Sequence, residues 1–278
     1  MKRLYITDLD GTLLGSDGSI SAKTADIVNR LTQSGMYFTF ATARSVYSAK
    51  PLTAALGINV PCILMNGVSI YDLKADGYIA NQYISADASE KVIEAFRRED
   101  AEVFLYRFNE DILTCYYTKV TTRVMQSFAE VRKNRYNKPY VQCADLIDAA
   151  NERTVYYTAL AEYERLLPVK LAVDGIEGVD CAFYEDTYTG KWFLEVFSAA
   201  ASKSNGLRYL RERYGFEEVV AFGDNLNDLP MFAQADIKVA VGNAREEVKA
   251  AADCIIGTND DDGVAEYLLS VHIYQDNL

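Results

Sequence analysis

Histidine is almost absent from this sequence of 278 residues, which contains a single one, His272, close to the carboxyl end. A Ser-His-Asp or Cys-His catalytic site, or a histidine-rich metal site, would have to be built around that one residue. We therefore expect any acid and base chemistry in this chain to depend on carboxylates and lysine.

Long apolar runs and paired cysteines are also missing. No segment approaches the roughly 20 apolar residues that cross a bilayer, and the amino terminus does not resemble a signal peptide. The five cysteines lie far apart, without the paired spacing of a zinc site or a disulfide framework. These absences predict a cytoplasmic protein with free thiols and no membrane partner.

Basic residues are in the minority, because 28 lysines and arginines face 40 acidic residues and leave a formal net charge of -12. Binding of nucleic acid through a broad surface requires clustered lysine and arginine that neutralise phosphates. The charge balance therefore argues against a nucleic-acid partner, and it favours solubility instead.

Four short apolar segments each run into a polar residue, a pattern typical of strands buried on both faces of a parallel sheet. These segments cover residues 4–7, 37–41, 62–65 and 219–223. Helical patterns at 21–34, 203–214 and 228–235 alternate with them. The order predicts an α/β fold with a doubly wound, Rossmann-like parallel sheet, in which ligands bind beyond the carboxyl ends of the strands.

Residues 83–187 have a different sequence pattern from the flanking segments, because aromatic residues recur there in short alternating runs. Alternation is typical of antiparallel strands with one solvated face. We interpret this stretch as an inserted α+β domain, so that residues 1–82 and 188–278 form a core that is discontinuous in sequence. With only five prolines and no Gly-Ser tract, the connections are expected to be short crossings near 79–84 and 187–193.

Two pairs of carboxylates fall at predicted strand ends. Asp8 and Asp10 follow the first strand, separated by one residue, and Asp224 and Asp228 follow the strand at 219–223. Two like charges about 4 Å apart repel by about 4 kcal/mol at an effective dielectric constant near 20, so four converging carboxylates need a cation. All-oxygen ligation at a small site favours Mg²⁺, the cofactor that we infer and one that suits the binding of a phosphate.

Other strand ends carry groups that also suit a phosphate. Thr42 offers a hydroxyl and a backbone N–H at a turn, and Lys203 stands where a helix begins. Asn66 and Gly67 offer an amide and an accessible backbone, although this pair is more often a plain turn. Arg44, just past Thr42, is either a substrate contact or a surface charge.

Four sequence motifs occur in a fixed order. The first is Asp-Leu-Asp-Gly-Thr-Leu at 8–13, and the second is Thr42 in Ala-Thr-Ala-Arg. The third is Lys203 in Ser-Lys-Ser-Asn-Gly, and the fourth is Gly-Asp-Asn-Leu-Asn-Asp at 223–228. Together they resemble the haloacid dehalogenase superfamily, and within it the Cof-type phosphatases with a large C2-type cap inserted after the third core strand. The resemblance covers nearly the whole chain, although the family more often has glycine directly after the lysine.

This resemblance implies roles for the motif residues. Asp8 would attack phosphorus and become an aspartyl phosphate, while Asp10 would protonate the leaving alcohol and then activate water. Mg²⁺ would bind the carboxylates of Asp8 and Asp224 and the backbone carbonyl of Asp10, and Asp228 would orient water on the metal or Lys203. The residues implied as holding the phosphoryl oxygens are Thr42, Lys203, Asn227 and the backbone of Leu9.

These features predict a magnesium-dependent phosphomonoesterase that acts on a small phosphorylated metabolite, such as a sugar phosphate, with the cap as a lid that sets specificity. A phosphomutase, which passes the phosphoryl group to another sugar oxygen, stays open as an alternative. A signalling receiver also uses clustered aspartates, a threonine, a lysine and Mg²⁺, but the large insertion speaks against it. The sequence does not distinguish a monomer from a homodimer.

Overall fold

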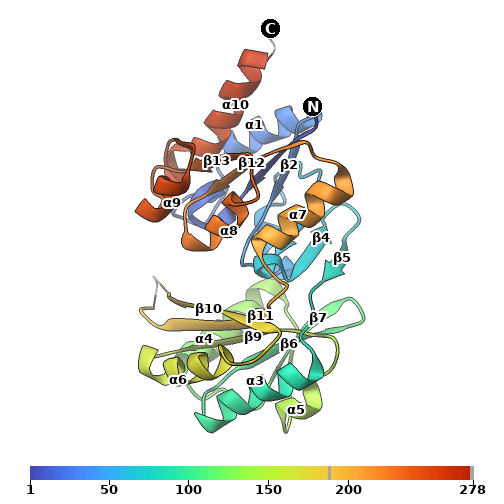
Figure 1. Ribbon diagram of the computed structural model, residues 1–278, viewed down its shortest axis with the longest axis vertical. Coiled ribbons are helices and arrows are strands. Elements are labelled where there is room, and N and C mark those ends of the chain that lie inside the picture. Colours follow the sequence, from blue (N-terminus) through green and yellow to red (C-terminus); the bar gives the residue numbers. More distant parts are fainter. Residues whose placement is uncertain (187–188, 276–278) are drawn as a thin grey trace. The chain divides into compact units, whose positions relative to one another are not determined.

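The computed structural model describes residues 1–186 and 189–275 and divides the chain into two compact units (Figure 1). The core unit joins Met1–Ala80 to the chain from Ser202 onward, and the inserted unit is Asn81–Ala201. Each unit has a hydrophobic core of its own. A core interrupted by a contiguous insertion is the organisation that the sequence predicts.

A parallel sheet of five strands forms the centre of the core unit. In spatial order its strands are β14 (Cys254–Ile255), β13 (Ile237–Ala240), β12 (Glu218–Gly223), β1 (Arg3–Thr7) and β2 (Tyr37–Phe40). Every pairing is parallel, and β1 lies between β12 and β2. Their apolar residues are buried on both faces of the sheet, which explains the near-continuous apolar runs in the sequence.

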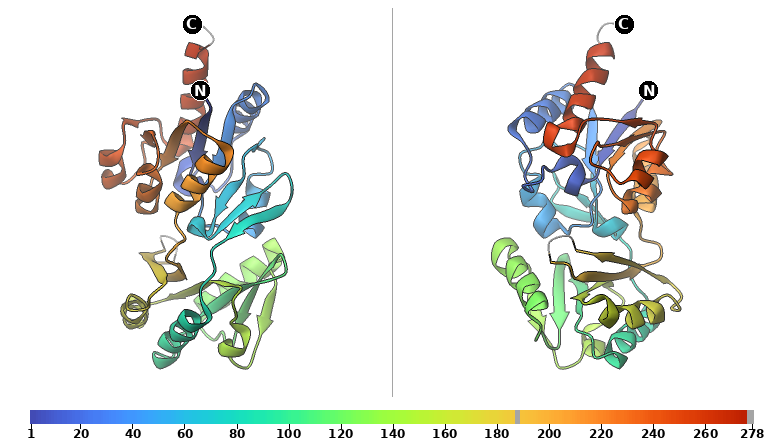
Figure 2. Two further views of the ribbon diagram at one scale, coloured as in Figure 1. Left: turned by 45° about the vertical axis from the view of Figure 1, so that its right-hand side comes forward. Right: turned by 90° about the vertical axis from the view of Figure 1, so that its left-hand side faces the viewer.

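Helices cover both faces of this sheet (Figures 1 and 2). On one face α1 (Ala22–Gln33) packs against α10 (Gly263–Gln275), and on the other α7 (Lys203–Tyr214) packs against α8 (Leu229–Phe232). The shorter helices of this unit are α2 (Val46–Leu52) and α9 (Glu246–Ala251). The predicted doubly wound α/β architecture is therefore confirmed. The helix expected at 228–235 is shorter than predicted, because a 3₁₀ turn at Leu226–Asp228 precedes α8.

A small antiparallel sheet connects the two units along the chain. It consists of β3 (Cys62–Leu64), β4 (Ser69–Asp72) and β5 (Gly77–Asn81). A single parallel bridge between Ala41 and Ile63 places β3 beside the end of β2. The ends of β1, β2, β3 and β12 therefore meet at one edge of the core unit, where the predicted site residues lie.

The inserted unit is built on a sheet of six strands. In spatial order these are β10 (Val179–Glu185), β11 (Trp192–Ser198), β9 (Thr154–Ala161), β6 (Phe104–Asn109), β7 (Ile112–Tyr117) and β8 (Tyr140–Gln142). The pairings are antiparallel except between β7 and β8, so the unit is mixed rather than purely antiparallel. Its helices are α3 (Ala86–Arg98), α4 (Arg123–Tyr136), α5 (Leu146–Ala149) and α6 (Tyr163–Val173).

The second boundary of the insertion differs from the prediction. Strand β11 pairs with β9 and β10, so residues 192–198 belong to the inserted unit and not to the predicted core segment 188–278. The apolar run of β11 is typical of a doubly buried core strand, but β11 is buried because it is an interior strand of the other sheet. The first boundary, after Ala80 rather than residue 82, differs by two residues. Residues 187 and 188 themselves lie outside the described part of the chain.

In the described part of the chain, no helix combines the length and the apolar character that crossing a membrane requires.

Candidate active site

The first motif places a buried carboxylate beside a buried lysine. Asp8 follows β1, and its backbone N–H donates to the carbonyl of Phe222 on β12, which fixes the strand end. The Nζ of Lys203, at the start of α7, lies 2.5 Å from Oδ1 of Asp8 and 2.7 Å from Oδ1 of Asp228. All three side chains are less than a tenth exposed. Three motifs that are far apart in the sequence thus meet at one point.

The loop after β12 is arranged by Asp228. Its Oδ2 accepts the backbone N–H groups of Asp224 and Asn225, each at 3.0 Å, while its Oδ1 accepts from Lys203. Asp228 therefore accepts three hydrogen bonds within the protein, one of them from Lys203, and its orienting role in catalysis stays a prediction. The carboxylate of Asp224 takes no part in these hydrogen bonds. Its Oδ1 accepts a hydrogen bond from the hydroxyl of Thr12 at 2.7 Å.

Gly11 lets the first loop approach Asp224. Its φ of +76° lies in the left-handed region, and a Cβ at this position would come within 2.5 Å of Oδ2 of Asp224. Thr12 is a site residue that the sequence analysis did not single out, although it lies inside the first motif. The sequence signal that could have identified it is a hydroxyl side chain two residues after Asp10.

Asp8, Asp224 and Asp228 form an acidic cluster in which one oxygen from each lies within 4.8 Å of the others. Burial raises the pKa of Asp8, and Lys203 offsets this only in part because Asp228 and Asp224 add to the rise. Burial also raises the pKa of Asp224 to about 6, with a further contribution from Asp228. Burial opposes the charge on Lys203, but the carboxylates of Asp228 and Asp8 outweigh it and raise the pKa of the ammonium.

Three carboxylates thus face one ammonium in a site with little solvent. The excess negative charge and the all-oxygen donor set fit a small divalent cation, which would stabilise the ionised carboxylates. Asp228 already accepts three hydrogen bonds, so Asp8 and Asp224 are the carboxylates with capacity left for a metal.

Asp10 does not join this cluster, although the sequence analysis expected four converging carboxylates. Its side chain is half exposed and receives two hydrogen bonds from the guanidinium of Arg44, at 2.8 and 2.6 Å. Alternation along an extended strand would place Asp8 and Asp10 on the same side, but β1 ends at Thr7 and the chain turns through Leu9–Leu13, with Gly11 at φ +76°. Arg44, left open as a substrate contact or a surface charge, is a partner of Asp10.

The remaining predicted residues lie at neighbouring strand ends. Thr42 is buried, but its backbone N–H donates to the carbonyl of Ile63, so the prediction that this N–H is offered to a phosphate is wrong. Its hydroxyl, which accepts the N–H of Arg44 at 3.1 Å, stays available as a donor. Leu9 has a buried side chain, and its backbone belongs to the loop that carries Asp8 and Asp10.

The turn after β3 contains two further predicted site residues, Asn66 and Gly67. The side-chain amide of Asn227 donates to Oδ1 of Asn66 at 3.5 Å, which links the fourth motif to this turn. Gly67 has φ +101°, and a Cβ there would overlap the backbone of Ser202 at the start of α7. Asn66 is thus close to the predicted phosphate contacts, while Gly67 is required by packing.

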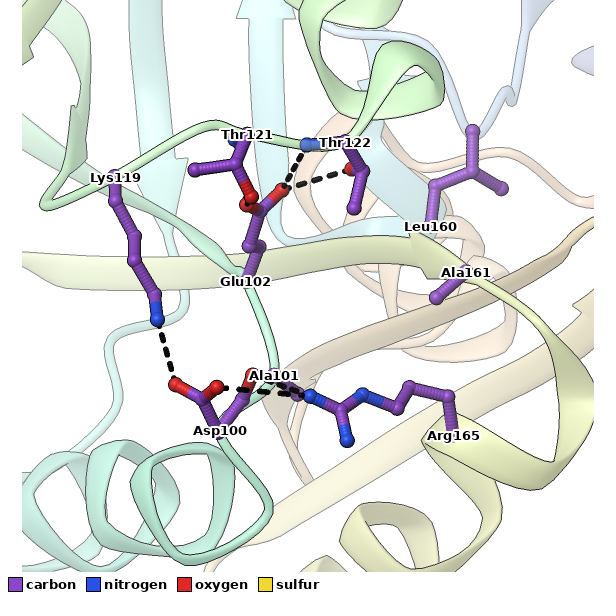
Figure 3. A pocket seen from close by; sticks show the side chains of 9 residues that line it. All are labelled: Asp100, Ala101, Glu102, Lys119, Thr121, Thr122, Leu160, Ala161 and Arg165. Atoms are coloured by element: carbon purple, nitrogen blue, oxygen red, sulfur yellow. Dashed lines mark hydrogen bonds and ion pairs between the residues drawn. The ribbon is translucent and has the colours of Figure 1, made fainter.

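A separate pocket lies wholly within the inserted unit, and it contains none of the motif residues (Figure 3). Its polar groups bond to one another: Lys119 lies 2.6 Å from Asp100, and Glu102 accepts hydrogen bonds from the backbone N–H of Thr121 and the hydroxyl of Thr122. With its polar groups satisfied internally, this pocket is not the candidate active site.

Comparisons with known proteins indicate the family of this chain. A family model described as haloacid dehalogenase-like hydrolase matches residues 5–268. The chain is 26% identical to pyridoxal phosphate phosphatase YbhA of Escherichia coli, covering 96% of this chain and 98% of that protein. It is 29% identical to HMP-PP phosphatase of Serratia proteamaculans, covering 96% and 94%.

Solved structures agree as well. The fold matches a crystal structure of a haloacid dehalogenase-like hydrolase from Bacteroides thetaiotaomicron with a TM-score of 0.81 and 25% identity, over 98% of this chain and all of that one. A family match over nearly the whole length, relatives that are phosphatases, and a shared fold lead to one conclusion. The chain belongs to the haloacid dehalogenase-like hydrolases, among the phosphatases of that family.

Proposed function

We propose that this protein is a magnesium-dependent phosphomonoesterase that hydrolyses a small phosphorylated metabolite through an aspartyl phosphate on Asp8. The observation that carries the proposal is the buried contact of Asp8 with Lys203 inside a cluster of excess negative charge. A carboxylate is a competent nucleophile only when ionised, and both the ammonium and a bound divalent cation favour that form.

Asp8 and Asp10 have environments suited to two different roles. Asp8 is buried and held by Lys203, which fixes its oxygen for attack on phosphorus. Asp10 is half exposed and pairs with Arg44, so it can exchange protons with solvent once that pairing is released. Two carboxylates in unlike environments can divide nucleophilic and acid–base work between them.

The other polar groups suit a phosphoryl group next to Asp8. Lys203 supplies positive charge, and the hydroxyl of Thr42 and the amide of Asn227 supply hydrogen-bond donors. Asp8 and Asp224, with the backbone carbonyl of Asp10, are the groups proposed to hold Mg²⁺. When bound, the metal offsets the charge of the phosphate in the ground and transition states.

The substrate class rests on the relatives. The names of two of them refer to phosphorylated compounds, pyridoxal phosphate and HMP-PP, and we propose a small phosphorylated metabolite here. We also propose that the inserted unit acts as a lid that excludes water and selects the substrate, as lids do in many enzymes. A cytoplasmic location stays a prediction.

The test compares wild-type protein with Asp8→Asn and Asp10→Asn on p-nitrophenyl phosphate, with Mg²⁺ and with EDTA. We expect EDTA and Asp8→Asn each to reduce turnover by at least about a thousandfold, since each removes a part that the chemistry requires. Asp10→Asn should slow hydrolysis of the phosphoenzyme and let intact-mass spectrometry detect phosphate on the protein. Asp26→Asn, an exposed acid on α1, is the matched control.

Full magnesium-dependent turnover by Asp8→Asn would contradict the nucleophile assignment. Product analysis with a hexose 1-phosphate decides against a phosphomutase if inorganic phosphate is released and no isomer forms.

A further inference from the structure

Strand β10 forms one edge of the six-stranded sheet of the inserted unit (Figure 1). It has seven residues, and in the described part of the chain β11 is the strand with which it pairs. Among the strands at sheet edges there, β10 is the longest. An edge strand has a row of backbone N–H and C=O groups that no neighbouring strand uses, and this row can pair with a further strand.

The ladder between β10 and β11 determines which backbone groups point outward. In an antiparallel pair, every second pair of residues exchanges hydrogen bonds, and the residues between them direct their groups away. The N–H of Asp186 donates to the carbonyl of Lys191, and at the other end the N–H of Ala199 donates to the carbonyl of Gly178. The even-numbered residues of β10 therefore bond to β11. The residues with outward groups are Val179, Cys181, Phe183 and Glu185.

Proteins commonly protect such an edge with a very short strand, a lysine, a proline or a β-bulge. The pairing of β10 with β11 is continuous, and β10 contains neither lysine nor proline. The opposite edge of the same sheet differs, because β8 has three residues and follows Lys138 and Pro139. On β10 the N–H of Cys181 is covered, since it donates to Oδ1 of Asp180 at 2.7 Å. The charges of the strand are its two acids, Asp180 and Glu185.

Aromatic side chains flank this edge on both faces of the sheet. On the face covered by α6, the ring centroid of Phe183 lies 4.7 Å from that of Trp192 and 5.6 Å from that of Tyr163. On the other face, the ring centroid of Tyr184 lies 5.4 Å from that of Phe193. Tyr163 is 39% exposed and Tyr184 is 41% exposed. A strand that pairs with β10 would cover part of this aromatic surface, so apolar burial would add to the backbone hydrogen bonds.

A second copy of β10 can pair with the first around a two-fold axis, as the two halves of most homodimer interfaces do. The outward rows of the two strands meet only when odd-numbered residues face odd-numbered residues. The registers that pair most of the strand are therefore centred on Cys181, Ala182 or Phe183. Like charges directly opposite each other destabilise an antiparallel pair, so the acids decide among these registers.

Two of the three registers bring acids together. A dimer centred on Cys181 would place Glu185 opposite Glu177 of the partner subunit. A dimer centred on Phe183 would place Asp180 opposite Asp186 of the partner subunit. The negative charges that neighbour β10 therefore argue against both.

The register centred on Ala182 keeps the acids apart. Asp180 then faces Tyr184 of the partner subunit, and Glu185 faces Val179 of the partner subunit. The two copies of Asp180 are about 14 Å apart along the strands at about 3.4 Å per residue, which exceeds the screening length of about 8 Å at physiological salt. The N–H of Cys181 would exchange its contact with Asp180 for the carbonyl of Phe183 of the partner subunit.

We propose that this protein forms a homodimer in which the β10 strands of two copies pair antiparallel around a two-fold axis at Ala182. The two six-stranded sheets then form one continuous sheet. The outward N–H and C=O groups of each strand bond to those of the other. This interface uses residues of the inserted unit alone, so the proposal does not depend on the proposed phosphatase function.

Sedimentation velocity of the full chain between about 1 and 200 µM tests the association. We expect a dimer fraction that rises with concentration and a Kd of about 1 to 100 µM, as suits a small interface. Ala182→Lys places two ammonium groups opposite each other at the axis and should raise the Kd at least about tenfold. Ala54→Lys adds the same charge at an exposed position of the core unit and should leave the Kd unchanged.

A cross-link tests the register. In the proposed dimer the two copies of Ala182 form a non-hydrogen-bonded pair with Cα atoms about 4.5 Å apart, within the reach of a disulfide. Oxidised glutathione should therefore link Ala182→Cys into a covalent dimer, and peptide mapping should place the disulfide at the substituted position. Asp180→Cys is the control, because position 180 does not face itself and should form no such link.

Several outcomes would overturn the proposal. A wild type that stays monomeric at about 200 µM rules out the dimer, and if it then binds a synthetic peptide of residues 178–186, the edge accepts an extended segment instead of a second copy. A dimer that Ala182→Lys leaves intact and Ala182→Cys does not cross-link uses another surface. A disulfide through Cys181 in the wild type would place the axis at that residue. If Ala182→Lys fails to fold, as its melting temperature would show, the cross-link decides.

Discussion

Gly67 is a residue whose identity follows from one close approach. Its φ of +101° and the nearby backbone of Ser202 leave no room for a side chain, and the turn it belongs to lies beside the start of α7. The contact therefore ties β3 to the helix that carries Lys203. A replacement must move the backbone of one segment or the other.

We predict that Gly67→Ala lowers the free energy of unfolding by more than about 3 kcal/mol, because overlap with backbone cannot be relieved by a rotamer change. Urea unfolding measures this change in the free energy of unfolding. Gly77→Ala in β5 is the control, since a Cβ there meets nothing within 4 Å. Equal stabilities of the two variants would show that the turn adjusts freely.

Lys138 gives a second prediction at this scale, a pH dependence of stability. Burial lowers its pKa to about 7 in the folded protein, against about 10.4 for an unfolded lysine. Below pH 7 Lys138 is protonated in both the folded and the unfolded protein, so the free-energy cost of burying its charge does not change with pH. Above pH 7 the unfolded state binds more protons, so stability rises with pH by up to about 1.4 kcal/mol per unit.

The Lys138→Met variant lacks this titration. We therefore expect the free energy of unfolding of Lys138→Met, relative to wild type, to fall by about 2 kcal/mol between pH 7 and pH 9, measured by urea unfolding. Lys133→Met should run parallel to wild type over the same range. A constant difference between Lys138→Met and wild type would mean that Lys138 stays charged in the folded protein.

At the scale of elements, α7 is the helix on which the site depends. It begins at Lys203, and the side chain of Ser202 caps it by accepting the backbone N–H of Asn205 at 2.9 Å. Removing such a cap costs about 1 kcal/mol and loosens the first turn. The first turn of this helix contains the lysine that contacts Asp8.

We predict that Ser202→Ala lowers the free energy of unfolding by about 1 kcal/mol and also lowers kcat, because Lys203 is held less firmly. Ser85→Ala removes the equivalent cap of α3 in the inserted unit and should destabilise the protein to a similar extent without a kcat effect. Similar kcat values for the two variants would mean that Lys203 is positioned by its ion pairs alone.

Most elements of the core unit could be predicted from the sequence because their signals are local. Apolar runs that end at Asp8, Thr42 and Gly223 are short and doubly buried, as strands of a parallel sheet are. Strand β11 shows the limit, since an interior strand of the inserted sheet has the same apolar run. Only the pairing partner distinguishes the two cases.

The site could be predicted in part for the same reason. Motif order identifies Asp8, Lys203 and Asp228, which do meet. The pairing of Asp10 with Arg44 depends on side-chain direction after a turn, and the use of the Thr42 N–H by Ile63 depends on strand pairing. Neither contact has a signature in the spacing of residues.

At the scale of the whole molecule, the acidic cluster belongs to one unit only. A cation that binds the folded state and not the unfolded chain stabilises the protein by about 2.7 kcal/mol at a hundredfold excess over its Kd. We therefore predict that Mg²⁺ raises the melting temperature and that hydrogen exchange slows in β1 and β12 but not in β9 or β11.

Asp224→Asn should remove this stabilisation by Mg²⁺, while Asp26→Asn should keep it. Protection spread evenly over both units would instead indicate that the metal acts on the protein as a whole.

The discontinuity of the core unit has a consequence for the newborn chain. Asp8 and Lys203 are 195 residues apart, and β12, the neighbour of β1, is made later still. Until β12 has been synthesised, one edge of β1 has no strand to pair with. The inserted unit is a single continuous stretch and can fold as it emerges from the ribosome. The segment that carries Asp8 can then complete its sheet only after β12 has been made, so that Asp8 and Lys203 come into contact only after the whole inserted unit has been synthesised.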